Sequence, residues 1–157
     1  MANELALLSA ILRRDFAIFI AKVFETLCHG EVFHDNWHLD CLAHHLALAA
    51  LGQRIRLIIN LPPRSLKSIA ASVALPAWLL GHDPSSRMIT VSYSEDLARK
   101  HARDCRIVIE SDWYSSTFPA TRLSRRKNTE TEITTTHTAF ASQPRSAELL
   151  PVVVATC

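Results

Sequence analysis

Several features that would narrow the class of this protein are missing from its sequence. The 4 cysteines stand at positions 28, 41, 105 and 157, so no CxxC pair occurs and nothing indicates a disulfide framework. The apolar run from Leu5 to Leu12 ends at Arg13, Arg14 and Asp15. It is too short for a membrane span, and no basic region of the kind that opens a signal peptide precedes it. These absences favour a cytoplasmic protein with no membrane partner.

An excess of charge of one sign is also lacking. The chain has 17 Lys and Arg against 15 Asp and Glu, a net charge of +2, which is too balanced to indicate a nucleic-acid partner. The basic run of Arg122, Arg125, Arg126 and Lys127 is local, and we interpret it as a solvated loop. A hydrophobic content of 48% over 157 residues is typical of one ordinary domain with an apolar core.

Apolar periodicity predicts helices at the N-terminus. Between Glu4 and Leu27, apolar residues recur at three- and four-residue steps, which predicts one amphipathic helix. Asn36 is a candidate cap for a second helix that begins at Trp37 and ends near Gly52. Residues 1–52 are therefore expected to form an N-terminal helical segment.

Strands and helices are predicted to alternate after this segment. Arg54–Asn60 (RIRLIIN) and Met88–Ser92 are short, apolar and β-branched, which is typical of buried strands. Helices are expected over Lys67–Leu80, where Pro76 would kink or end the helix, and over Glu95–Glu110. The order strand, loop, helix, strand, helix predicts an α/β fold with a parallel sheet and right-handed crossovers.

The loop between the first strand and the first crossover helix has the plan of a phosphate-binding loop. Backbone N–H groups at a helix N-terminus bind anions. Lys67 would place its charge on the β- and γ-phosphates, and the Ser68 hydroxyl would ligate Mg²⁺. None of the 3 glycines lies here, however: the pattern GxxxxGK[ST] has glycine where this chain has Leu61 and Leu66. Leucine does not readily adopt a positive φ, so a surface lysine at a helix start is the alternative.

Histidine and cysteine do not form a convincing metal motif. Five histidines cluster between His29 and His45, but only His34 and His38 have the spacing of one helix face, which disfavours a metal site. Cys105 has apolar neighbours on a predicted helix, and we interpret it as a packing residue.

The phosphate-loop segment also resembles a known family. Ile58–Ser68 (IINLPPRSLKS) resembles the variant Walker A motif of phage and prophage large terminase subunits, in which a Pro-Pro-Arg stem ends in Lys-Ser. Asn36-Trp37-His38 resembles the family's adenine-side segment. Four further segments resemble the family's second strand and following helix: VSYS (91–94), LA (97–98), DWY (112–114) and FP (118–119). The resemblance covers roughly residues 33–136.

This resemblance implies a fold, ligands and residue roles. The fold would be α/β, an incomplete P-loop NTPase parallel sheet of the terminase ATPase type with N-terminal helices, occupying residues 53–136. ATP and Mg²⁺ would bind, with Ser68 on the metal and Arg64 as a catalytic arginine acting in cis. The residues implied in nucleotide binding are Pro63, Arg64, Ser65, Leu66, Lys67, Ser68, Trp37 and His38. Two alternatives stay open: a salt bridge at the loop edge for Arg64, and a core position for Trp37.

In the intact family, the large subunit is the ATP-driven motor that packages double-stranded phage DNA in the bacterial cytoplasm. Its partners are the portal and the small terminase subunit, and a nuclease domain cuts the DNA. The acidic motif that organises Mg²⁺ and water is not found in this sequence, so we expect the fragment to be inactive alone. Two other classes remain: another P-loop nucleotide-binding protein, and a small helical interaction protein without enzymatic activity.

Residues 137–157 do not resemble the family. Back-translated with suitable synonymous codons and read two bases later, residues 139–157 encode FRIATSVGGTLTGRGGNV. That sequence resembles the family's next segment, a TSVGG stretch followed by TGRG. We therefore hypothesise a single frameshift near residues 137–139, which truncates a terminase gene and makes the tail unrelated to the fold.

Overall fold

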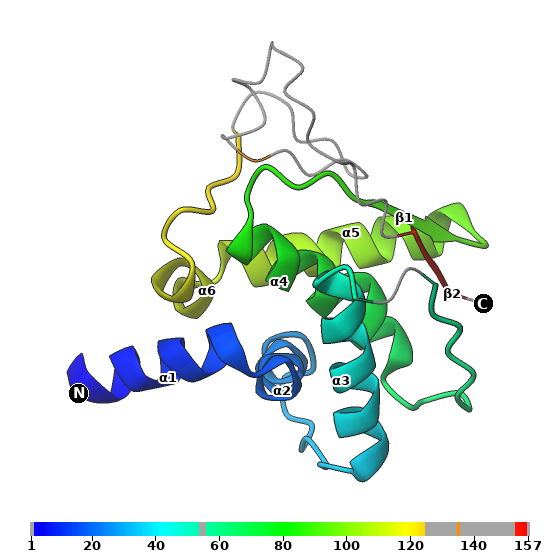
Figure 1. Ribbon diagram of the computed structural model, residues 1–157, viewed down its shortest axis with the longest axis horizontal. Coiled ribbons are helices and arrows are strands. Elements are labelled where there is room, and N and C mark those ends of the chain that lie inside the picture. The colour runs from blue at the N-terminus through cyan, green and yellow to red at the C-terminus, as the bar shows by residue number, and fades with distance from the viewer. Residues whose placement is uncertain (1, 54–55, 125–134, 136–152, 157) are drawn as a thin grey trace.

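The structure is a computed structural model that describes residues 2–53, 56–124, 135 and 153–156. Helices make up most of the described chain (Figure 1). They are α1 (Ala2–Arg14), α2 (Phe16–Leu27), α3 (Trp37–Ala50), the π-helix η1 (Ile69–Ala74), α4 (Leu75–His82), α5 (Glu95–Glu110) and α6 (Asp112–Thr117). The strands are β1 (Ile89–Ser92) and β2 (Val153–Thr156).

The α/β fold class predicted from the sequence is wrong. The described part of the chain is mostly helical, and its only sheet is the parallel pairing of β1 with β2, each 4 residues long. A P-loop NTPase core is a parallel sheet covered by helices on both faces. Two short strands do not supply that core, so the expected incomplete terminase-type sheet is not the architecture of this chain.

The two predicted strands show where the sequence pattern misled. Residues 56–60 form no strand, and Ile58 is 95% exposed. An apolar, β-branched run becomes a strand only where a neighbouring strand completes its backbone hydrogen bonds and covers its side chains. The second prediction, Met88–Ser92, coincides with β1, but Ile89 is 67% exposed and Val91 49%. This strand is therefore not the buried one that was expected.

Asp15 divides the predicted single N-terminal helix into two. Its carboxylate accepts hydrogen bonds from the backbone N–H groups of Ala17 (2.9 Å) and Ile18 (3.1 Å), which caps α2. Because the chain changes direction at this cap, α1 lies across the view of Figure 1 while α2 is seen nearly end-on. The sequence pattern continues through Asp15, since both helices place apolar residues at helical spacing.

The core forms where α2 packs against α3, η1 and α5. Phe19 of α2 is fully buried at 0% exposure. Its ring lies 5.5 Å from that of Trp113, 6.4 Å from that of Tyr114 and 6.2 Å from that of Phe118, all in edge-on arrangements. Aromatic pairs of this geometry add to the energy of burial. α6 and the residue after it are thus anchored to the N-terminal helices.

Pro76 neither ends nor interrupts the helix that follows the candidate phosphate loop. The helix runs from Lys67 through η1 into α4 and ends at His82. A proline lacks the N–H that would bond to the carbonyl four residues earlier, here Ser72, and its ring collides with that carbonyl. The preceding turns widen into a π-helix, in which the Leu75 N–H donates to the Ala70 carbonyl. The wider turn accommodates the proline.

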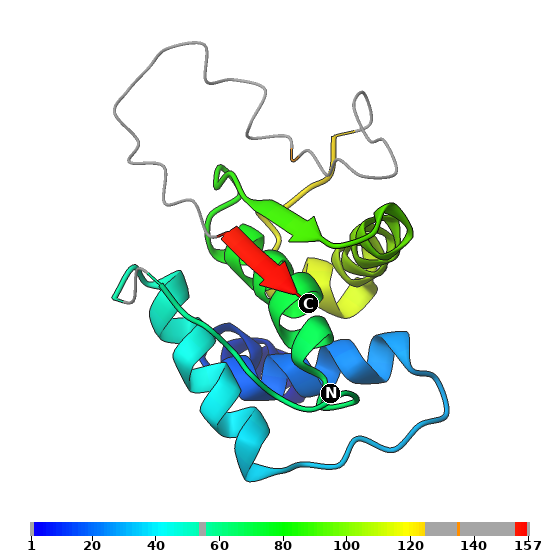
Figure 2. The same cartoon turned by 90° about the vertical axis from the view of Figure 1, so that its right-hand side faces the viewer.

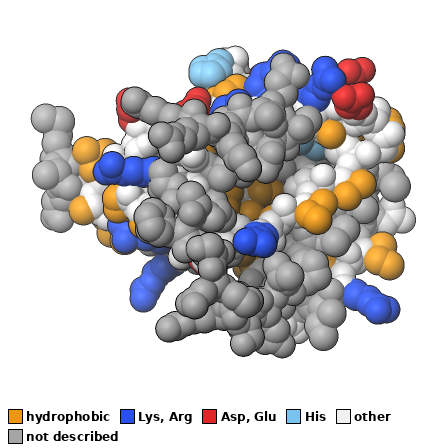
Figure 3. All heavy atoms as spheres, turned by 90° about the horizontal axis from the view of Figure 1, so that it is seen from above, with side chains coloured by type: hydrophobic (Ala, Val, Ile, Leu, Met, Phe, Trp, Pro, Cys, Tyr) orange, Lys and Arg blue, Asp and Glu red, His pale blue; other side chains and the backbone are white. Residues whose placement is uncertain are grey.

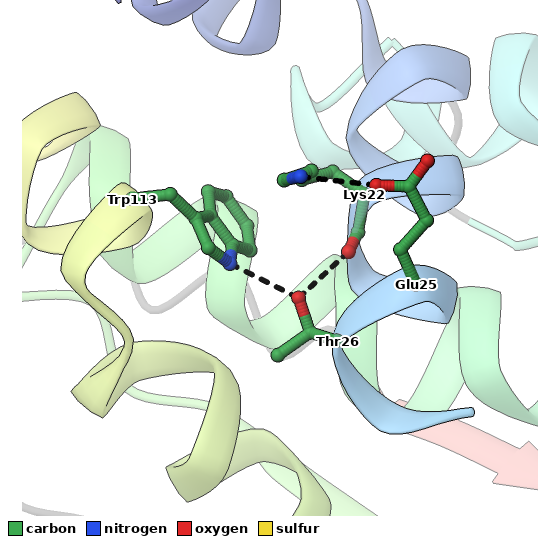
Figure 4. A network of polar contacts seen from close by, with 4 residues as sticks. All are labelled: Lys22, Glu25, Thr26 and Trp113. Atoms are coloured by element: carbon green, nitrogen blue, oxygen red, sulfur yellow. Dashed lines mark hydrogen bonds and ion pairs between the residues drawn. The ribbon is translucent and has the colours of Figure 1, made fainter. Parts of the chain in front are cut away.

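Two side chains of α6, Trp113 and Tyr114, join this helix to α2 and α4 by hydrogen bonds. Trp113 Nε1 donates to Thr26 Oγ1 (3.0 Å), and Thr26 Oγ1 donates to the Lys22 carbonyl (2.8 Å), which joins α6 to α2 (Figure 4). The buried Tyr114 hydroxyl donates to the Ala77 carbonyl (2.7 Å). Burial raises the pKa of Tyr114, so this hydroxyl stays a donor.

Little of the predicted C-terminal tail is described. Of the Thr-rich stretch at 129–136, only Thr135 lies within the described residues, where it forms an isolated antiparallel bridge with Leu123. The proposed frameshift point at 137–139 lies outside them. The backbone of β2 is described, and it pairs with β1 in register from Ile89 opposite Val153 to Ser92 opposite Thr156. Among the described helices, none combines the length and apolar character needed to cross a membrane.

Candidate phosphate-binding loop

The predicted site residues 63–68 lie at the end of loop 61–66 and in the first helical residues before η1. The chain passes beside α3, turns at this loop and enters the helix at Lys67 (Figure 2). Beyond the loop the helix is firmly held, because Ala70, Val73 and Ala74 are each 0% exposed. The loop is therefore presented at the end of a buried helix rather than on a free-standing one.

The backbone of this loop is strained. Arg64 has a φ of 65° and Leu66 a φ of 59°, and within the described residues they are the only non-glycine residues with positive φ. Each left-handed residue other than glycine costs on the order of 1–2 kcal/mol. Leucine was expected to resist a positive φ at position 66, where the phosphate-loop pattern has glycine. The structure nevertheless has a positive φ there.

The positive φ of Leu66 is followed at once by a helical residue, Lys67. A left-handed residue followed by a helical one forms a nest, in which successive N–H groups converge on a concavity that binds anions. Leu66 and Lys67 are such a pair. In the described part of the chain, no side chain caps the start of η1, and the Ala70 N–H donates to the Leu66 carbonyl at 2.9 Å. The N–H groups just before Ala70 have no acceptor within the helix.

Two cations accompany these donors. Lys67 Nζ donates to the Leu61 carbonyl at 2.9 Å, so its side chain folds back across the loop. Arg64 is exposed. Within the described residues neither cation forms an ion pair, so the salt bridge considered for Arg64 has no partner there. The loop therefore combines positive charge with the positive end of a helix dipole.

The two serines of the loop differ in their surroundings. Ser65 is only 9% exposed, and its Oγ has no hydrogen-bond partner among the described residues. Ser68 is half-buried and lies at the helix start with φ −70° and ψ −40°. No group of three or more His, Cys, Asp or Glu placed to hold a metal occurs in the described residues. Mg²⁺ bound at Ser68 would therefore rely on phosphate oxygens and water for its other ligands.

The predicted adenine-side residues lie at the start of α3. Trp37 is 78% exposed, so the alternative of a core position is wrong. Its ring stands edge-on to that of His38 at 6.4 Å. The beginning of α3 and the loop lie on the same lower side of the molecule in Figures 1 and 2. The resemblance placed this tryptophan near the adenine and left a core position open, because an aromatic at a helix start gives no signal of its exposure.

Other candidate groups are structural or lack a chemical role. Cys105 is 3% exposed, and burial raises its pKa to about 12, which confirms its interpretation as a packing residue.

Ile89, Val91 and Tyr93 alternate along and just after β1 and are exposed. Hydrophobic side chains are also visible at the surface between the grey residues in Figure 3.

Comparison with known proteins yields no relative. The chain matches no family model, and neither a curated protein nor a solved structure matches it. The terminase resemblance stays a prediction from the motifs.

Proposed function

We propose that loop 61–68 binds the phosphate groups of a nucleotide, ATP with Mg²⁺, and that the chain is part of a phage-type large terminase subunit. One observation carries the binding proposal: Leu66 holds a left-handed conformation immediately before Lys67, at the start of a buried helix. The binding proposal concerns this local loop and does not depend on a parallel sheet.

Backbone strain supports a binding role for the loop. Strained conformations of non-glycine residues persist where the surrounding structure enforces them, and they cluster at binding and catalytic sites. A loop that served only to connect α3 with η1 would not need two such residues within three positions. The convergent N–H groups that this strain produces are a reason to maintain it.

The positive charges of the loop suit a phosphate group. The Lys67 ammonium would exchange its bond with the Leu61 carbonyl for phosphoryl oxygens, and Arg64 would approach from the exposed side of the loop. Ser68 would ligate Mg²⁺ bound to the same phosphates. Trp37 and His38 are proposed near the adenine because of their motif, with Trp37 exposed.

The terminase part of the proposal rests on the order of the separated motifs. For this chain we propose nucleotide binding; ATP hydrolysis, DNA packaging and contact with the portal and small subunit belong to the intact family. The gene's DNA from codon 130 onward is the independent test. Codons that keep the shifted frame open into an acidic motif would support a terminase origin, whereas codons incompatible with that frame would refute the proposed frameshift.

Thermal unfolding and calorimetric titration of the full chain with Mg-ATP test the binding proposal. At a concentration 100 times the Kd, a ligand adds about 2.7 kcal/mol of stability, or roughly 5–10 °C in melting temperature for a chain of this size. Lys67→Ala should abolish most of this shift. Lys22→Ala is the matched control, because Lys22 lies on α2 in an exposed ion pair with Glu25.

Two outcomes would contradict the proposal. If the wild-type chain binds no nucleotide, the reading as a small helical interaction protein gains weight. If binding occurs but Lys67→Ala leaves it unchanged, the nucleotide occupies a different site. An adenosine control should show no shift, because the proposed site recognises phosphate.

A further inference from the structure

Helix α1 projects from the body of the molecule with most of its side chains in solvent (Figure 1). Among its described side chains, only Ser9 and Leu12 are buried, and the helix packs against α2 and α6. Leu5 is 65% exposed and Leu7 63%. Hydrophobic side chains also lie at this protruding end in Figure 3, on its left. Neighbouring apolar side chains left in solvent mark a surface that another molecule covers.

Three apolar side chains share one face of α1. Successive residues are roughly 100° apart around a helix, so Leu7 and Ile11 stand one above the other with Leu8 beside them. Leu7 and Leu8 are exposed, and Ile11 is half-buried. Leu7 lies roughly 140° around the helix from the buried Leu12, so this face is turned away from the core. We call Leu7, Leu8 and Ile11 the outer face of α1.

Opposite charges stand at the two ends of the outer face. Glu4 lies in the first turn of α1 and Arg14 in the last, and both are exposed. Each lies within roughly 60° of Leu7 around the helix. Glu4 and Arg14 are equally far from the middle of α1, and so are Leu7 and Ile11. An antiparallel copy of the helix therefore places Glu4 opposite Arg14 and Leu7 opposite Ile11, and each pairing occurs twice.

We infer that the outer face of α1 binds the same face of a second copy of this chain, with the two helices antiparallel. A two-fold dimer requires a self-complementary surface, because both copies contribute the same residues. The charges select the antiparallel arrangement, since a parallel one brings like charges together. Helix α1 has 13 residues. That is a length of roughly 20 Å, so the dimer should be weak, with a Kd on the order of 10 μM.

The dimer surface is separate from the candidate phosphate-binding loop. In Figure 1, α1 lies on the left of the molecule, and the loop that leads into η1 lies on the right. Pairing through α1 therefore leaves loop 61–68 open to a nucleotide. The inference goes beyond the proposed function and does not depend on it.

Two leucines of α1 give a matched pair of variants. Leu7→Gln changes the outer face and should raise the Kd of the dimer about tenfold or more, because symmetry makes one substitution act at two places. Leu5 is equally exposed but lies on the inward side of the helix, roughly 20° from Leu12. Leu5→Gln should therefore leave the Kd within about twofold of the wild type. Glutamine keeps the helix propensity of leucine, so both variants retain α1.

Charge reversal tests the antiparallel register. Arg14→Glu places two carboxylates opposite each other at both ends of the interface, and Glu4→Lys does the same with two cations. Each single variant should therefore weaken the dimer. The double variant Glu4→Lys with Arg14→Glu restores opposite charges at both ends and should recover the affinity.

The experiment is sedimentation equilibrium of the full-length wild type and these variants, at concentrations from below to well above the expected Kd. The expected result is a concentration-dependent dimer that Leu7→Gln weakens, Leu5→Gln preserves and the double charge reversal recovers. A wild type that stays monomeric overturns the inference, and so does a dimer that Leu7→Gln leaves unchanged, because a different surface then joins the copies. Equal weakening by both leucine variants, or no recovery in the double variant, overturns the antiparallel pairing. Circular dichroism of the monomers checks that α1 is intact; if Leu7→Gln loses helix, the charge-reversal variants decide.

Discussion

Replacing Arg64 by glycine should stabilise the ligand-free chain. Arg64 has a φ of 65° and is exposed, so its conformation can be relieved without removing a buried contact. The left-handed conformation costs on the order of 1–2 kcal/mol for a residue with a Cβ. Glycine removes that cost and returns about 0.5–1 kcal/mol through its greater freedom in the unfolded chain. The net expected gain is about 0.5–1 kcal/mol.

Arg64→Ala separates this effect from the loss of the guanidinium. Alanine removes the same charge but keeps a Cβ, so it retains the left-handed cost and should not be stabilising. Both variants should weaken Mg-ATP binding to a similar degree, because both lose the cation. Urea unfolding measures the stability difference, and calorimetric titration measures the affinity.

Two results with the Arg64→Gly and Arg64→Ala variants would contradict the expected strain at position 64 or the role of Arg64 in binding. If glycine and alanine give equal unfolding free energies, position 64 does not hold a positive φ, and the loop geometry behind the proposed function falls. If glycine is stabilising but both variants bind Mg-ATP as the wild type does, the strain is real and Arg64 does not contact phosphate. The direction of each difference decides the matter, since both magnitudes are small.

Two further predictions concern the core and its response to acid. Gly81→Ala should destabilise the chain by about 1–3 kcal/mol, because a Cβ at Gly81 would lie 2.7 Å from the Phe118 ring. Urea unfolding measures this loss. In the same assay, adding Phe118→Leu to Gly81→Ala should recover part of it. Burial lowers the pKa of His101 below 6.5, with Lys100 contributing. The unfolded chain therefore binds this proton more tightly, and stability present above pH 6.5 should be lost as the pH falls below it. His101→Leu should flatten that slope in unfolding measured from pH 8 to pH 5, and an unchanged slope would exclude His101.

Local signals in the sequence predicted α3 and α5 but not the division between α1 and α2. Asn36 stands at the N-cap position of α3 as predicted, without a side-chain capping hydrogen bond, and Glu95–Glu110 was predicted with the bounds that α5 has in the structure. Asp15 was missed because the apolar periodicity continues across it, although its side chain caps α2. Periodicity reports which face is apolar, and a capping residue decides where the helix begins.

The sheet could not be predicted because a strand depends on its neighbours. Ile58 and Ile89 both stand in short apolar runs, but only the second run pairs, with a segment more than sixty residues later in the chain. No local pattern carries that information. The same limit applies to Ser65. Its burial, and the absence of a hydrogen-bond partner for its Oγ among the described residues, arise from the fold of the turn, and a serine in a loop gives no sign of either.

The loss of the predicted sheet does not remove the candidate site, because the features of the site are local. Leu66 and Lys67 set the direction of the donors, Lys67 Nζ closes the loop on the Leu61 carbonyl, and the helix behind them is fixed by buried residues. Hydrolysis is a different requirement, since it needs carboxylates placed beside the phosphates by neighbouring elements. The loop by itself supports a proposal of nucleotide binding and none of hydrolysis. Binding and turnover are therefore separate questions for this protein, and the loop bears on the first alone.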